Sequence, residues 1–216
     1  MHSRLAALCF GAALALPAAP INIQNASFET HDPFTVVSPT FGAWNSTVID
    51  WNAPGGFLAG QFTAVPAVLS PIATDGSVVV YILNASISQI LTAVVTPGVT
   101  YDLTVDVGRA IGDPNSGFAI GLFAGGNLLA RDNHPAPLGF GWITDSVTYT
   151  SPLGDPNAGQ ALQIVLTSFG TETEFDNVRL DAESAPEPGS LLLVSLGAAI
   201  LLGRRIFRRA LLERVH

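Results

Sequence analysis

The chain has 216 residues, of which 48% are hydrophobic and 12% charged, and 17 acidic residues against 9 Arg give a net charge of -8. So high an apolar content excludes an acidic disordered chain, which lacks the hydrophobic residues needed to fold. The negative charge excludes a nucleic-acid binder, which needs a basic face to displace phosphate counterions. Residues 20–185 carry 15 of the acids and only 3 Arg. We therefore expect an acidic folded body between two apolar, basic ends.

The N-terminal segment, residues 1–19, is typical of a secretory signal peptide. Arg4 lies near its start, and an apolar run over residues 5–16 leads to small residues at its end. A buried first helix is the alternative, but such a helix would alternate polar and apolar faces. Cys9 lies inside the segment, so the mature chain would contain no cysteine. We expect neither a disulfide nor a thiol nucleophile.

The body, residues 20–185, has the length of one domain, and its hydrophobic pattern is that of β-strands. The clearest strand is residues 100–107, where apolar side chains alternate with Thr and Asp. Clusters of Gly, Pro and Asn separate the strands, and residues 125–127 suit a hairpin turn. The pattern predicts an all-β fold, an antiparallel sandwich and specifically a jelly roll. The other expected strands are residues 77–83, 87–95, 118–123, 143–150, 162–167 and 175–180.

Residues with catalytic chemistry are sparse in the body. His31 and His134 are isolated loop histidines, and there is no metal-spaced His pair, no Gly-x-Ser-x-Gly motif and no phosphate-binding glycine loop. Two of the acids could form a glycosidase pair, but no spacing singles them out. We expect a body that is not an enzyme, with a glycan hydrolase as a lesser alternative.

Aromatic side chains suggest a second alternative, a glycan-binding adhesin. Trp44 and Trp51 lie in a polar stretch between expected strands, where flat rings could stack on sugars or could pack in the core. Trp142 precedes an apolar strand and is expected to pack inside.

The C-terminal segment, residues 186–216, predicts a membrane anchor. Residues 190–203 are 14 uncharged residues, about 21 Å of helix against a hydrocarbon core of roughly 30 Å, and Arg side chains can snorkel across part of the gap. An Arg cluster after such a run stays cytoplasmic and leaves the body outside. The residues of this stop signal are Arg204, Arg205, Arg208 and Arg209.

The motif Pro186-Glu187-Pro188, the apolar run and the Arg cluster together resemble the sorting tail of PEP-CTERM proteins of Gram-negative bacteria. The resemblance implies a transmembrane helix at about residues 189–207. It also implies export through the Sec translocon, an inner-membrane intermediate, and cutting by an exosortase-type membrane protease. The product would be a cell-surface or exopolysaccharide-matrix protein, in contact with extracellular polysaccharide and not with nucleic acid.

A second resemblance covers most of the body. Residues 25–29, 96–103 and 175–180 are similar, in this order, to the start, middle and end of galactose-binding-like jelly-roll modules, which include many carbohydrate-binding modules. The resemblance implies a structural calcium between Glu29 and Asp176. By strand parity with Val178, Asp176 is expected to face the core, where an unpaired charge is costly. Calcium or hydrogen bonds from loop amides could each satisfy it.

Overall fold

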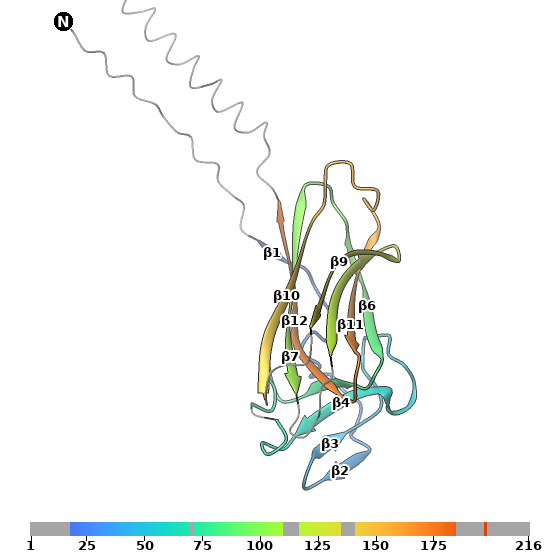
Figure 1. Ribbon diagram of the computed structural model, residues 1–216, viewed down its shortest axis with the longest axis vertical. Coiled ribbons are helices and arrows are strands. Elements are labelled where there is room, and N and C mark those ends of the chain that lie inside the picture. Colours follow the sequence, from blue (N-terminus) through green and yellow to red (C-terminus); the bar gives the residue numbers. More distant parts are fainter. Residues whose placement is uncertain (1–17, 70, 110–116, 135–140, 185–196, 198–216) are drawn as a thin grey trace, which may run out of the picture. The chain divides into compact units, whose positions relative to one another are not determined.

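The computed structural model describes residues 18–69, 71–109, 117–134, 141–184 and residue 197. Residues Ala18–Glu183 form one compact unit, built from two antiparallel sheets (Figure 1). The larger sheet has the order β10-β7-β12-β5-β4-β3-β2, with β1 on β12, and the smaller has the order β6-β11-β8-β9. The prediction of an all-β antiparallel fold is confirmed. The strands are β1 (Ala19–Pro20), β2 (Val36–Ser38), β3 (Gly42–Trp44), β4 (Ala59–Ala64), β5 (Val79–Ile82), β6 (Ser86–Val94), β7 (Val99–Arg109), β8 (Phe118–Ala124), β9 (Asn127–His134), β10 (Gly141–Thr150), β11 (Ala161–Ser168) and β12 (Thr173–Ser184), and a single 3-10 turn spans Gly56–Leu58.

The main core lies between the two sheets. Leu103 of β7 in the larger sheet shares it with Ile120 of β8 and Ile164 of β11 in the smaller sheet, and all three are fully buried. Burial of each such side chain contributes about 1.5–3 kcal/mol. The alternation expected for residues 100–107 is confirmed, because the apolar side chains of β7 belong to this core. The intervening Thr and Asp side chains therefore face away from it.

A smaller apolar group, the outer cluster, lies on the opposite face of the larger sheet. In β5, Val80 belongs to the main core whereas its neighbours Val79 and Tyr81 belong to the outer cluster, as alternation along a strand requires. Trp44 and Trp142 pack against this cluster and are partly buried. Trp142 therefore packs against apolar side chains, as expected, but outside the core between the sheets.

All seven strands expected from the sequence are present, and those that were missed lack a period-2 apolar pattern. Strand β4 is buried at five of its six positions, so it shows no alternation. Strand β9 is a polar strand at the edge of the smaller sheet. The turn at residues 125–127 is confirmed as a hairpin between β8 and β9, in which Gly125 and Gly126 both have positive φ.

Most of the two terminal segments lies outside the described residues. This holds for residues 1–17 of the expected signal peptide, for the whole sorting motif and Arg cluster, and for the expected transmembrane helix apart from residue 197. Ala19 and Pro20 form β1, which pairs with β12. Among the described ranges, no helix combines the length and the hydropathy needed to cross a bilayer.

Candidate active site

An irregularity in β12 places an acid on the outer face of the larger sheet. Phe175 and Val178 both belong to the main core, although residues three apart on a regular strand point to opposite faces. Asn177, between them, has a φ of 50°, the left-handed conformation found at bulges. Because the alternation breaks here, Asp176 lies on the outer face, and the expectation that it shares a face with Val178 was wrong.

Asp176 is fully buried and is held by the segment that covers this face. Its Oδ2 accepts hydrogen bonds from the Thr74 amide at 2.7 Å, the Thr74 hydroxyl at 2.9 Å and the Asp75 amide at 2.9 Å. Its Oδ1 accepts one from the Asn177 amide at 2.7 Å. Burial raises the pKa of Asp176 to about 6 against the effect of these hydrogen bonds. A fraction of the molecules therefore carries a proton on this carboxyl at neutral pH.

Asp106, on the outer face of β7, has the opposite tendency. Its Oδ1 accepts a hydrogen bond from the Thr144 hydroxyl at 2.7 Å, and its Oδ2 accepts one from the Asn177 side-chain amide at 2.9 Å. The guanidinium of Arg179 lies 3.7 Å from Oδ1. Burial acts to raise the pKa of Asp106, but hydrogen bonds from Thr144, Thr74 and Asn177 and the charge of Arg179 outweigh it and hold the pKa below its usual range. Asp106 is therefore ionised at neutral pH.

Two residues join these carboxyls, which we call the acid pair. Asn177 donates its backbone amide to Asp176 and its side-chain amide to Asp106. The Thr74 hydroxyl bonds Asp176 and also lowers the pKa of Asp106 through a hydrogen bond. A hydroxyl has one proton and two acceptor lone pairs, so Thr74 can accept a proton from one carboxyl while donating to the other. Neighbouring acids with opposed pKa shifts are the usual arrangement for proton transfer in catalysis.

An aromatic ring flanks the acid pair on the same face. Along the β10–β7 ladder, Thr144 pairs with Asp106 and Trp142 pairs with Gly108, so Trp142 and Thr144 point to the same side. The ring of Trp142 lies over Gly108, where an added Cβ would come within 2.8 Å of it. Its Nε1 donates a hydrogen bond to the Pro71 carbonyl at 2.8 Å. The site thus combines a buried acid pair with a flat apolar surface.

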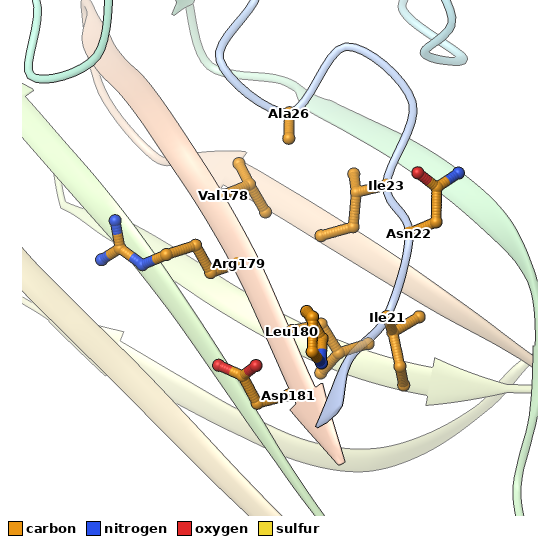
Figure 2. Close-up of a pocket in the computed structure, with 9 residues that line it drawn as sticks. Ile21, Asn22, Ile23, Ala26, Val178, Arg179, Leu180 and Asp181 are labelled. Atoms are coloured by element: carbon orange, nitrogen blue, oxygen red, sulfur yellow. The ribbon is translucent and has the colours of Figure 1, made fainter. Parts of the chain in front are cut away.

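An open pocket of about 380 Å³ lies between β12 and the segment that follows β1. Figure 2 shows Ile21 and Ile23 of this segment beside Leu180 of β12. Neither member of the acid pair lines the pocket. The pocket is therefore suited to binding an apolar group, but a group bound there would not contact the acid pair.

A second group of ionisable side chains, the Asp–His cluster, joins β9 to β10. Asp132 and His134 of β9 and Asp145 of β10 have their ligand atoms within 4.8 Å of one another, so they could hold a metal ion. Burial raises the pKa of Asp145, and the charge of Asp132 acts in the same direction. The Ser146 amide and His134 act against that shift.

The residues of the predicted calcium site converge on one segment. The Oε1 atom of Glu29 accepts hydrogen bonds from the Ser77 and Val78 amides, both at 2.7 Å, a few residues after the amides that bind Asp176. Loop amides are the alternative to calcium that the sequence leaves open. The calcium site itself stays a prediction.

The two tryptophans suggested for glycan binding belong to different apolar groups. Trp51 is only 6% exposed and packs in the main core with its ring 5.5 Å from that of Phe28. Trp44 packs against the outer cluster. They therefore do not form a shared sugar-binding surface.

Sequence reasoning missed Asp106 and Thr74 as site residues, and it assigned Trp142 to the core. One signal was present, because the outward positions of residues 100–107 include two acids on the strand with the clearest pattern. Thr74 gives no such signal, since only the folded chain brings it to Asp176, 102 residues away.

The fold and the site together define a β-sandwich protein with two hydrogen-bonded carboxyls whose pKa values are shifted in opposite directions. The chain belongs to the HpiC1-like family (HpiC1 cyclase), whose sequence profile matches residues 19–181. No curated protein matches the chain.

Solved structures agree with this assignment. The chain is 27% identical to Fisc, a Stig cyclase from Fischerella sp. TAU in complex with (3Z)-3-(1-methyl-2-pyrrolidinylidene)-3H-indole, with a TM-score of 0.67 over 78% of this chain and 100% of that one. It is also 27% identical to a cyclase from Fischerella sp. TAU in complex with 4-(1H-indol-3-yl)butan-2-one, with a TM-score of 0.66 over 79% of this chain and 100% of that one.

The family overturns the expectations drawn from the chain ends. The assignment to PEP-CTERM proteins and the function of a sorted surface or matrix protein were wrong, as were the adhesin and glycan-hydrolase alternatives, because the body matches a cyclase family. The expectation that the body is not an enzyme was wrong for the same reason. Three partners were expected from the same assignment and were also wrong: the exosortase-type protease, the Sec translocon and extracellular polysaccharide. The expected location at the cell surface was wrong for the same reason.

Proposed function

We propose that this chain is a cyclase that starts ring closure by protonating its substrate, with Asp176 as the acid. The observation that carries the proposal is the acid pair, in which Asp176 has a pKa raised to about 6 while the pKa of Asp106 is lowered. The scaffold is a jelly roll. Residues 20–185 are its catalytic domain, to which Ala19 is joined through β1, and residues 186–216 are a terminal segment.

The proton moves from Asp176 to the substrate through Thr74. Asp176 is fully buried, whereas Thr74 is exposed and bonds it at 2.9 Å. With Asp176 ionised, the Thr74 hydroxyl donates to its Oδ2; with Asp176 protonated, the hydrogen bond runs the other way. The Thr74 hydroxyl then accepts the proton of Asp176 and gives its own to a double-bonded carbon or nitrogen of the substrate, which becomes a cation. Asp106 remains ionised and stabilises that positive charge. Ring closure forms a bond within the substrate. The cyclised cation then loses a proton to the Thr74 hydroxyl, which passes its own proton to ionised Asp176 and so returns the acid to its starting state.

The substrate class follows from the aromatic surface and the charge. Both ligand-bound cyclases contain compounds with an indole ring, and Trp142 presents a flat ring beside the acid pair on which such a ring can stack. The body has 15 acids against 3 Arg, so a neutral or cationic substrate is favoured over an anionic one. We propose an indole-bearing, largely apolar substrate that needs no external oxidant or reductant to cyclise.

The calcium predicted between Glu29 and Asp176 would assign a different role to the same carboxyl. A bound cation requires Asp176 to be ionised, whereas the acid must carry a proton. Burial raises the pKa of Asp176 to about 6, which favours the protonated carboxyl over the ionised one that a cation requires. We therefore favour the proton-donor role and keep calcium as a prediction for separate testing.

The proposal is tested by following the proton. Purified protein is incubated with indole-bearing alkenes in D2O, and the cyclised product is analysed for deuterium by mass spectrometry. We expect a deuterated product, and we expect Asp176→Asn to lower the rate about 10²–10⁴-fold, the usual contribution of a general acid.

Asp102→Asn is the matched control. Asp102 is on the same face of β7 and bonds Thr148, but it is not part of the acid pair. Its substitution should leave the rate within a factor of about 2. A product formed at equal rates by the wild type and Asp176→Asn would overturn the assignment of the acid.

A further inference from the structure

We propose that Asp132, His134 and Asp145 form a binding site for a divalent transition-metal ion of the Zn²⁺ type. Strand β9 is an edge strand of the smaller sheet, and β10 is an edge strand of the larger one. A metal ion bound here would tie the two sheets together along their open edge. The site shares no residue with the acid pair, so the inference is independent of the proposed function.

The two separations that involve His134 Nε2 suit a tetrahedral ion, and all three ligand atoms lie within 4.8 Å of one another. Asp132 and His134 are two residues apart on β9 and so project to the same side, while Asp145 approaches from β10. His134 Nε2 is 3.2 Å from Asp132 Oδ2 and 3.5 Å from Asp145 Oδ1. Metal–ligand bonds of about 2.0–2.1 Å at tetrahedral angles place ligand atoms about 3.3–3.4 Å apart. The two measured separations lie on either side of that range.

A buried oxygen without a partner points to a missing cation. The side chain of Asp145 is only 9% exposed, and its Oδ2 has no hydrogen-bond partner among the described residues. Its Oδ1 accepts the Ser146 amide at 2.9 Å. Oδ1 is also the oxygen that faces His134. An unsatisfied buried carboxylate oxygen is unfavourable, and a cation bound by the Asp145 carboxylate would offset that cost.

A simple ion pair accounts for this geometry less well. His134 Nε2 carries at most one hydrogen, yet it faces oxygens of two carboxylates, so only one of the two contacts can be a hydrogen bond. Two carboxylates and one imidazolium also leave a net negative charge at a partly buried site. A divalent ion would balance the two carboxylates and leave the imidazole neutral, as metal ligation requires.

The surroundings fit a Zn²⁺-type ion better than Ca²⁺. The ring of His134 stacks on Phe118, with centroids 5.4 Å apart and planes 13° apart, which fixes the direction of its lone pair. One imidazole nitrogen with two carboxylates is a donor set for zinc and related ions, whereas Ca²⁺ takes oxygen ligands only. The side chains of His134 and Asp132 are 40% and 42% exposed, so the ion could enter and water could complete its shell.

The test is metal binding by the tag-free chain after removal of bound metals with a chelator. Titration calorimetry with Zn²⁺ should give one equivalent bound, and Co²⁺ should produce the visible absorption of a tetrahedral site. Zn²⁺ should also raise the melting temperature. We expect Asp145→Asn, and separately His134→Gln, to raise the Kd for Zn²⁺ at least about a hundredfold, since even loss of an outer-shell partner costs 10–100-fold.

His31→Gln is the matched control, because His31 is an exposed histidine that stacks on Phe34 and takes no part in the cluster. It should leave the Kd unchanged, and so should Asp176→Asn. Absence of stoichiometric Zn²⁺ binding, binding that survives both cluster substitutions, or binding of Ca²⁺ in place of Zn²⁺ would each overturn the proposal. None of these outcomes affects the test of the acid pair.

Discussion

The acid pair and the Asp–His cluster use the same strand pair in opposite ways. Asp106 pairs with Thr144 across β7 and β10, whereas Asp145, the next residue along β10, pairs with Val105. Neighbouring residues on a strand point to opposite faces, so the two sites lie on opposite sides of one ladder. Each oxygen of the acid pair has a hydrogen-bond donor, whereas Asp145 keeps one oxygen unpaired. The balance between burial and hydrogen-bond donors therefore differs among these three carboxyls, although all three belong to the same residue type.

Phe118→Ala should give the largest effect on stability. It should also weaken the Asp–His cluster and leave the acid pair unchanged. Phe118 is fully buried, stacks on His134 and meets the ring of Phe175 edge-on at 6.2 Å. Its removal should lower the free energy of unfolding by about 3–5 kcal/mol, as measured by urea denaturation.

Phe123→Ala is the control for Phe118→Ala, because Phe123 lies in the same strand but is outside the main core. It should cost clearly less. If the Phe118 variant still folds, its affinity for Zn²⁺ should fall while the acid pair keeps its activity. Equal loss at both sites would mean that the core, and not the local contact, supports the cluster.

The pH dependence of stability should separate the acid pair from an ordinary surface acid. The pKa of Asp176 is about 6 in the folded chain, against 3.8 for an unperturbed Asp, so the folded state binds more protons between these pH values. Folding therefore becomes more favourable as the pH falls from about 7 to 4, and this contribution is lost again as the pH rises through 6. It amounts to a few kcal/mol at most, at about 1.4 kcal/mol per pKa unit.

Asp176→Asn should remove that acid-side gain, which urea denaturation at pH 4, 5, 6 and 7 would show. Asp102→Asn again serves as the control and should leave the pH profile unchanged. A wild-type profile that falls steadily from pH 7 to pH 4, with Asp176→Asn showing the same slope, would contradict a raised pKa for Asp176.

Much of the fold could be predicted from the sequence because burial on a single face leaves a period-2 pattern. Strand β7 shows this most clearly, with its apolar side chains in the core and its Asp and Thr side chains outside. Strand β4 could not be found this way, because both of its faces are covered and Gly60 packs against Tyr81 and the Asn45 backbone. The bulge at Asn177 could not be predicted either. Assigning side chains to alternate faces assumes a regular strand, and the sequence pattern does not mark where that regularity breaks.

The site was much less predictable than the fold. Asp176 could be singled out as an acid that needs a partner, but its donors at Thr74 and Asp75 are about a hundred residues away. No short motif reports such a contact. The terminal segments have strong local sequence patterns, and these led to the incorrect prediction of a sorted surface protein. The chemistry of the site depends instead on the long-range register between β7, β10 and β12.

Calcium should have the smallest effect on stability, and the measurement tests whether Asp176 is a proton donor or a metal ligand. We expect the melting temperature to be the same, within about 1 °C, in calcium and in a calcium-selective chelator. The reason is that amide and hydroxyl donors already occupy Asp176 Oδ2 and Glu29 Oε1.

Glu29→Gln should then cost about 1–3 kcal/mol in both conditions, since it weakens two amide hydrogen bonds to a charged group. A rise of several degrees in calcium that is lost in Glu29→Gln would instead place the ion at this carboxyl. Asp176 would then be ionised at neutral pH, and the proton donor would have to be sought elsewhere on the outer face.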